Sequence, residues 1–148
     1  MNKNIVLVYP SRYLDEAAQA PSTPDFPMSL MYLAGASRKI CDDITIFDFN
    51  LKGNDIEYFE KTLLNKLPGV VGINCLFSMT IKQVIFLSEY IKDKFPETRV
   101  VGMHPTIFAE QIMQNCGSVD AVVLGEGDEA FPRLLEYYFT PPPPTKNR

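Results

Sequence analysis

Cys75 and His104 are the residues in this sequence best suited to nucleophilic chemistry. His104 is the only histidine among 148 residues, and Cys75 comes directly after a short apolar run. A cysteine close to a histidine can form a nucleophile and base pair, which would make the protein a small hydrolase or transferase. Free cysteines are also common as small buried hydrophobic residues, so a purely structural role for Cys75 stays open.

The spacing of the three cysteines does not suggest a metal centre. Cys41, Cys75 and Cys116 are each more than thirty positions apart. Structural zinc sites use close-spaced ligands, and an odd number of scattered cysteines does not form a disulfide framework. We therefore predict no metal ligands, and reduced thiols of the kind found in the cytoplasm.

Small and polar residues follow three apolar runs of the chain. The segments are Ser78-Met79-Thr80, Gly102-Met103-His104-Pro105-Thr106 and Gly125-Glu126-Gly127-Asp128. Turn glycines and helix caps would explain each segment by itself, with Ser78 or Thr80, Thr106 and Asp128 as caps. If the segments meet at one edge of a sheet, however, they form a crest that can bind a ligand, and we favour this interpretation.

Five apolar runs must position these segments. They cover residues 5–9, 44–49, 70–74, 100–102 and 121–124, and helical spacing of apolar residues follows each run. Runs of nearly continuous apolar character indicate strands buried on both faces of a parallel sheet. The alternation predicts an α/β fold, a doubly wound three-layer sandwich of flavodoxin-like or Rossmann-like type. We expect a five-stranded parallel sheet of order 2-1-3-4-5, with ligands beyond the carboxyl ends of the strands.

Three common uses of this fold are excluded by the residues after the strands. A dinucleotide site needs glycines after the first strand, but the first glycine of the chain is Gly35. A flavin mononucleotide loop rich in Ser, Thr and Gly is also missing, because the first run leads into Pro10-Ser11-Arg12-Tyr13. A phosphoacceptor receiver would have an Asp at the end of the third strand, where this chain has Asn74 and Cys75.

The ordered series of motifs resembles the cobalamin-binding domain at the N-terminus of many radical S-adenosylmethionine enzymes. The resemblance extends from Ile5 to about Phe139, with matches at residues 26–34, 46–50, 72–74, 78–80, 100–106 and 120–131. The last two segments are the most specific. The family typically has a glycine-rich turn with His-Pro-Thr or a close variant, followed by a Gly-Glu-Gly-Glu-like turn.

The resemblance implies a corrin lying across the carboxyl edge of the sheet, with its nucleotide tail running beside the sheet. Matched by position, the expected cofactor-binding residues are Ser78, Met79 and Thr80 in the tail pocket, Gly102 and Met103 beside it, His104, Gly125, Glu126 and Gly127 at its border, and Pro10, Ser11 and Arg12 near the corrin. The loop after the first strand has no histidine, so cobalt would be bound without a protein imidazole.

Met103 departs from the family pattern, which usually has a second glycine after Gly102. A methionine side chain there could occupy space that the nucleotide needs. The alternative is therefore a non-enzymatic interaction or regulatory domain that has kept the fold and no longer binds cobalamin.

Catalysis is expected to belong to another domain or chain. The iron–sulfur cluster of the radical enzymes needs a Cys-x3-Cys-x2-Cys segment, which the three cysteines of this chain do not supply. The resemblance thus implies a partner, the radical S-adenosylmethionine domain of a methyltransferase, in the same polypeptide or in a separate one.

Length and composition limit the number of domains and the kinds of partner that this chain can have. A length of 148 residues with 46% hydrophobic residues predicts one domain, which we place at residues 1–140, followed by a proline-rich tail or linker at 141–148. A net charge of -4 argues against nucleic acid as a partner. No apolar stretch approaches the roughly 20 residues of a membrane span, so we expect a cytoplasmic protein without membrane contact.

Overall fold

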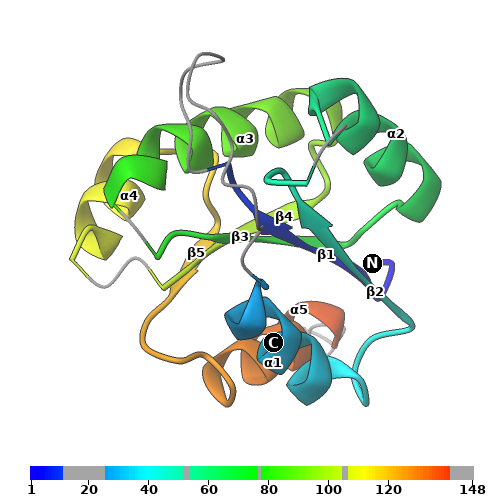
Figure 1. Ribbon diagram of the computed structural model, residues 1–148. Helices are drawn as coiled ribbons and strands as arrows, with labels where there is room; N and C mark the ends of the chain where they lie inside the picture. The colour runs from blue at the N-terminus through cyan, green and yellow to red at the C-terminus, as the bar shows by residue number, and fades with distance from the viewer. Residues whose placement is uncertain (12–25, 52–53, 77, 105–106, 141–148) are drawn as a thin grey trace, which may run out of the picture.

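The protein forms a parallel β-sheet covered by helices on both faces (Figure 1). The computed structural model describes residues 1–11, 26–51, 54–76, 78–104 and 107–140. The described strands are β1 (Asn4–Tyr9), β2 (Asp43–Asp48), β3 (Val70–Asn74), β4 (Arg99–Met103) and β5 (Ala121–Val123). They lie in the order β2-β1-β3-β4-β5, and all neighbours are parallel. The predicted fold class and strand order are confirmed.

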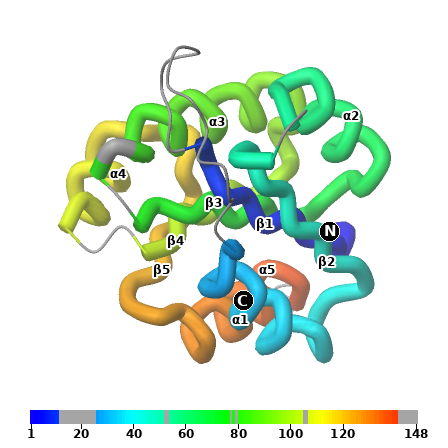
Figure 2. The backbone as a smooth tube through the Cα atoms, in the orientation of Figure 1, coloured from blue at the N-terminus to red at the C-terminus, as the bar shows by residue number. Residues whose placement is uncertain are grey.

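The described helices form the two outer layers. They are α1 (Met28–Ser37), α2 (Ile56–Lys66), α3 (Ile81–Lys94), α4 (Ala109–Asn115) and α5 (Ala130–Phe139), and a short 3-10 helix, η1 (Ser78–Thr80), precedes α3. Helices α2, α3 and α4 cover one face of the sheet, whereas α1 and α5 cover the other (Figure 1). The backbone tube shows α1 and α5 side by side (Figure 2).

The two faces of the sheet are packed separately because side chains alternate along each strand. On β1, Val6 and Val8 join the cluster under α2 and α3, while Ile5 and Leu7 join the cluster over α1 and α5. All of these β1 side chains are fully buried. This two-sided burial explains why the strands read as continuous apolar runs in the sequence.

The register brings three strand ends level with one another. Asn74 at the end of β3 is opposite Met103 of β4, and Met103 is opposite Val123 of β5. The loops that follow these strands therefore leave the sheet at one edge, as the sequence predicted. The helix layers flank this carboxyl edge and supply the walls of any site there.

Local details differ from the sequence predictions at the helix caps. Thr80 is the N-cap residue of α3, but its side chain makes no cap hydrogen bond. The N-cap of α5 is Glu129, one residue after the predicted Asp128, whose Oδ1 accepts a hydrogen bond from the Glu129 N–H at 3.1 Å. Thr106 and the predicted tail at 141–148 lie outside the described residues. Among the helices described, none is long and apolar enough to cross a membrane.

Candidate functional site

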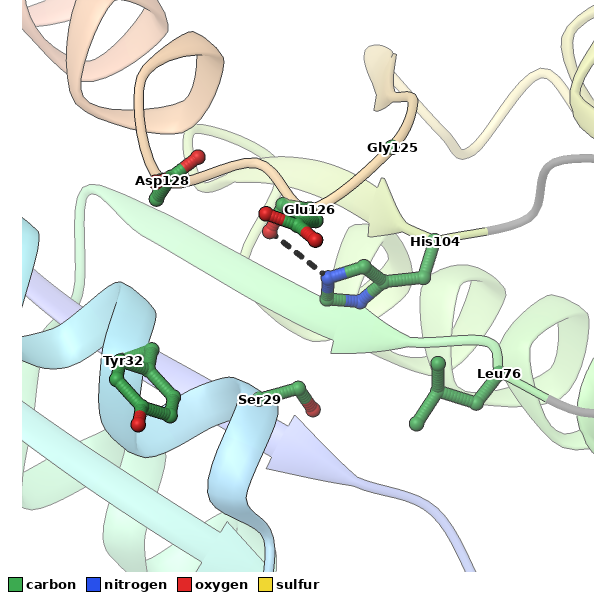
Figure 3. Close-up of a pocket in the computed structure, with 7 residues that line it drawn as sticks. All are labelled: Ser29, Tyr32, Leu76, His104, Gly125, Glu126 and Asp128. Carbon is green, nitrogen blue, oxygen red and sulfur yellow. Dashed lines mark hydrogen bonds between the residues drawn. The ribbon is translucent and has the colours of Figure 1, made fainter.

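A pocket of about 610 Å³ lies at the carboxyl edge of the sheet. Its described lining comes from α1, from the ends of β3 and β4, and from the loop between β5 and α5: Ser29, Tyr32, Leu76, His104, Gly125, Glu126 and Asp128. Figure 3 shows Ser29 and Tyr32 of α1 on one side of this pocket, with Glu126 and Asp128 of the β5–α5 loop opposite them. Its volume is in the range of ligand-binding pockets, about 300 to 1,000 Å³.

His104 joins the structural elements around the pocket. Its φ of 65° lies in the left-handed region, which non-glycine residues seldom adopt. The backbone N–H donates to Val123 O at 3.1 Å, and the ring places Nδ1 3.0 Å from Asn74 Oδ1 and Nε2 3.1 Å from Glu126 O. The dashed line in Figure 3 marks the contact with Glu126 O. His104 thus connects β3, β4 and the β5–α5 loop.

Asn74, which contacts the pocket residue His104, has a buried amide atom without a hydrogen-bond partner in the described part of the chain. The residue is 1% exposed, and its Nδ2 has no hydrogen-bond partner among the described residues. Turning the amide over would place Nδ2 against the His104 ring and leave Oδ1 unpaired instead, so one amide atom is unsatisfied in either orientation. A buried polar group without a partner costs about 1–3 kcal/mol. A ligand group that reached Asn74 would remove this cost.

The β5–α5 loop depends on two glycines. Gly125 and Gly127 have φ values of 72° and 79°, a conformation that favours glycine. A Cβ on Gly127 would also lie only 3.2 Å from Leu33 Cδ2 and from Val123 Cγ1. The glycines therefore let the loop fold closely against α1 and β5, with Glu126 held between them at the pocket.

Helix α1 supplies a wall of mixed polarity. It contains no charged residue, its Leu30 and Leu33 are fully buried, and its Tyr32 is exposed at the pocket. Together with Leu76, Tyr32 gives the lining an apolar surface, and the hydroxyls of Ser29 and Tyr32 can donate or accept hydrogen bonds. Such a wall suits a ligand with a large apolar body and polar arms.

The structure brings only part of the predicted site together. His104, Gly125 and Glu126 line the pocket, and Gly127 lies in the same loop. Met103 is fully buried in the cluster over α1 and α5, and a Cβ on Gly102 would meet Val122 and Val119 in ordinary contact.

The other predicted site residues lie elsewhere along the carboxyl edge. Ser78 and Thr80 form η1, and Thr80 is buried with its Oγ1 4.0 Å from Cys75 Sγ, so the described residues do not place either in the pocket lining. Pro10 follows β1, and its carbonyl accepts a hydrogen bond from Asn50 Nδ2 at 3.1 Å. Ser11 comes next and is half-buried. Arg12 and the side chain of Met79 lie outside the described part of the chain.

The packing argues against a Cys75–His104 catalytic pair. Cys75 is 3% exposed and belongs to the core cluster under α2 and α3, whereas His104 lines the pocket beside α1. Burial raises the pKa of the Cys75 thiol, and the hydrogen bond from Thr80 offsets only part of that effect. Both ring nitrogens of His104 already face oxygen atoms. Cys75 is therefore a structural residue.

The three thiols do not share a site either. Cys41, Cys75 and Cys116 are free and pack against three different core clusters. Within the described ranges, no group of three or more His, Cys, Asp or Glu side chains could hold a metal ion.

Sequence reasoning missed several lining residues. Ser29, Tyr32 and Leu76 are brought to the pocket by packing between elements distant in the chain, whereas Asp128 belonged to the predicted crest and was assigned only a capping role. Asn74 does not line the pocket but contacts the lining residue His104, and the sequence does contain a signal for it, a polar residue at the end of a fully buried strand.

Comparison with known proteins assigns the family. The family model described as "B12 binding domain" matches residues 24–135. The protein belongs to the B12-binding domain family.

One curated relative and one solved structure are also similar to this chain. The chain is 28% identical over 113 residues to the hopanoid C-3 methylase of Methylococcus capsulatus, covering 74% of this chain and 22% of the methylase. It therefore spans about a fifth of the length of that relative. A CheY-like protein (tadZ) from Pseudomonas aeruginosa PAO1 has a TM-score of 0.61 and 15% identity, covering 97% of this chain and 98% of the other. That likeness shows the fold alone.

Proposed function

We propose that this chain binds cobalamin at the carboxyl-edge pocket and presents it to a catalytic domain elsewhere. The observation that carries the proposal is the unsatisfied amide of Asn74 beside a pocket of about 610 Å³, in a chain of the B12-binding family. An orphaned polar group next to an open cavity is the arrangement expected of a site that a ligand completes.

The residues present fit a corrin. Tyr32 and Leu76 offer apolar surface to a large flat ring, and Ser29, Asn74 and the carboxylates can hydrogen-bond to its amide arms. His104 is the sole histidine of the sequence, and both its ring nitrogens are engaged. It would orient the pocket loop and leave cobalt without a protein imidazole. When bound, cobalamin supplies a cobalt atom that can carry a methyl group.

Methyl transfer itself would be carried out by a radical S-adenosylmethionine domain, in the same polypeptide or in a partner. The relative is named a methylase, and this chain covers only 22% of it. Both facts support the proposal that binding and methyl transfer are carried out by separate domains. The free thiols are consistent with action in the cytoplasm.

Gel filtration tests the proposal. The purified chain is mixed with hydroxocobalamin, and corrin absorbance is followed across the protein peak. We expect co-elution of protein and corrin. Complete separation at high micromolar concentrations of both components would contradict cobalamin binding.

Met103 supports a second candidate function, an interaction or regulatory domain that no longer binds cobalamin. Its side chain fills the space between the sheet and the α1–α5 layer, and its Cε and Sδ would come within 2.9 and 3.1 Å of a Cβ on Gly72. A nucleotide tail running beside the sheet would have to displace it. This candidate predicts that the wild-type chain does not bind cobalamin, whereas Met103 presents no obstacle to cobinamide, which lacks the tail.

Replacing Met103 distinguishes the candidates. If cobalamin binds only to a folded Met103→Gly or Met103→Ala variant, the second candidate is supported. If the wild-type chain binds cobalamin at least as tightly as cobinamide, Met103 does not block the tail and the first candidate stands.

A further inference from the structure

The pocket rim is acidic on one side. Glu126 and Asp128 both line it, and no lysine or arginine is among its described lining residues. Figure 3 shows both carboxylates on the β5–α5 loop, across from the uncharged Ser29 and Tyr32 of α1. A ligand seated between α1 and this loop therefore meets negative charge along one edge.

The rim carboxylates have unused hydrogen-bonding capacity. Within the described chain no donor reaches the Glu126 carboxylate, since His104 contacts the backbone oxygen of that residue instead. Among the described residues, Asp128 accepts a hydrogen bond from the Glu129 N–H alone, at 3.1 Å through Oδ1. An ionised carboxylate is an acceptor with about four lone-pair positions, so both side chains can take donors from a ligand.

The structure assigns Glu126 and Asp128 a role in corrinoid selectivity: they favour a corrin whose arms are amides over one whose arms are carboxylates. This inference rests on the proposed function. An amide arm has N–H donors for the rim and a carbonyl for the unpaired Asn74 Nδ2. A carboxylate arm has no donor for the rim and is repelled by it.

Binding of hydrolysed cobalamins tests the inference. Affinities of the chain for cobalamin and for its three monocarboxylic acids, each with one propionamide arm converted to propionate, are measured by equilibrium dialysis at low and high salt. At low salt we expect at least one acid to bind about five-fold more weakly than cobalamin, the effect of one like-charge contact at about 4 Å in water. High salt should narrow the difference because it screens exposed charges.

Two variants test whether the rim carboxylates cause the difference in affinity between cobalamin and the acids. The double substitution Glu126→Gln and Asp128→Asn should bring the acid and cobalamin to nearly equal affinity. Glu129→Gln is the matched control, because Glu129 is on the same loop, faces Arg133 at 3.8 Å and does not line the pocket. The Glu129→Gln variant should show the same difference in affinity between cobalamin and the acid as the wild-type chain.

The possible outcomes distinguish the proposed binding of cobalamin from the inferred selectivity of the rim. Equal binding of cobalamin and all three acids by the wild-type chain would overturn the inference and leave the proposed function intact. A difference that persists in the double variant would also overturn it. Failure to bind any of these corrinoids would overturn the proposed function and, with it, the inference.

Discussion

Substitution of Asn74 can separate the contribution of this side chain to ligand binding from its contribution to stability. Replacing it with leucine removes a buried polar group whose Nδ2 is unsatisfied, and also the contact with His104. The gain and the loss are each about 1 kcal/mol, so the free energy of unfolding should change by less than about 1 kcal/mol. Cobalamin affinity should fall roughly ten-fold, because the ligand loses a buried hydrogen bond.

Urea unfolding and cobalamin titration of the Asn74→Leu variant check this prediction. Unchanged affinity would mean that Asn74 does not face the ligand. Serine at position 74 serves as a second variant, since its hydroxyl can still hydrogen-bond and should keep more of the affinity than leucine.

His104 allows a test of backbone strain at the same site. Both His104→Gly and His104→Ala remove the ring contacts to Asn74 and Glu126. Only alanine keeps the cost of a Cβ at a φ of 65°. The glycine variant should therefore be the more stable of the two by roughly 1 kcal/mol in urea unfolding. Equal stability, or a more stable alanine variant, would show that the left-handed conformation is not retained without the ring.

The pairing of β3 with β4 makes an element-scale prediction about two glycines. A Cβ on Gly72 would come within 2.9 Å of Met103 Cε and 3.1 Å of Leu7 Cδ2, whereas one on Gly102 would lie 3.6 Å from Val122 Cγ2. Gly72→Ala should cost about 1–3 kcal/mol through overpacking, and Gly102→Ala should cost less than about 1 kcal/mol. Chemical denaturation of both variants measures the difference, and equal costs would contradict the packing described.

Asp120 connects α3, β4 and β5 at the amino edge of the sheet, opposite the carboxyl edge that holds the pocket. Its carboxylate accepts from Lys92 Nζ at 2.7 Å, from the Val100 N–H at 2.7 Å and from Arg99 at 3.0 Å. Burial alone would raise the pKa of Asp120, but these donors outweigh it and hold the pKa below its ordinary value. The charged form therefore contributes stability above about pH 4, the ordinary value for an unfolded chain, and the contribution is lost as pH falls through the folded pKa.

Asp120→Asn should lower the free energy of unfolding at pH 7 by about 1.5–3 kcal/mol, the usual value of hydrogen bonds to charged groups. The difference from the wild-type protein should shrink as the pH falls below about 4. Urea unfolding across this pH range provides the measurement. A difference that stayed constant from pH 7 to pH 3 would exclude the charge of Asp120 as the cause.

The elements were predictable because the central strands β1, β3 and β4 are largely buried on both faces. Strands β1 to β5 begin and end within one residue of the predicted runs, since a continuous apolar run leaves little freedom of placement. Cap positions were less predictable. A one-residue shift from Asp128 to Glu129 at the start of α5 changes few contacts, so the sequence does not distinguish the two.

The pocket lining was predictable only where it follows a strand directly. His104, Gly125 and Glu126 come just after β4 and β5, so the strand order places them at the carboxyl edge. Ser29 and Tyr32 belong to α1, and their approach to the β5–α5 loop depends on how α1 and α5 pack on the sheet. Periodicity shows which helix face is buried and does not show which loop that helix meets.

For the whole molecule, the arrangement is the one that the proposed function requires of a domain that holds a ligand. The sheet order and the helix layers bring the β3, β4 and β5 ends to one pocket, and the described residues there offer hydrogen bonds, apolar surface and negative charge. Cys75, the nucleophile that the sequence suggested, is buried in the core. Under the proposed function, chemistry on a methyl group would belong to another domain, to which this chain would present the corrin.

Paramagnetic broadening in NMR tests this account most directly. Titrating cob(II)alamin into the isotopically labelled chain should broaden the amide signals of Ser29, Tyr32, Leu76, His104 and Gly125, which surround the pocket. Signals of Thr45, Tyr58 and Asn65, which line a separate groove between β2 and α2, should remain sharp. Absence of broadening at the carboxyl edge, or broadening centred on the β2–α2 groove, would contradict the claim that this edge holds the corrin.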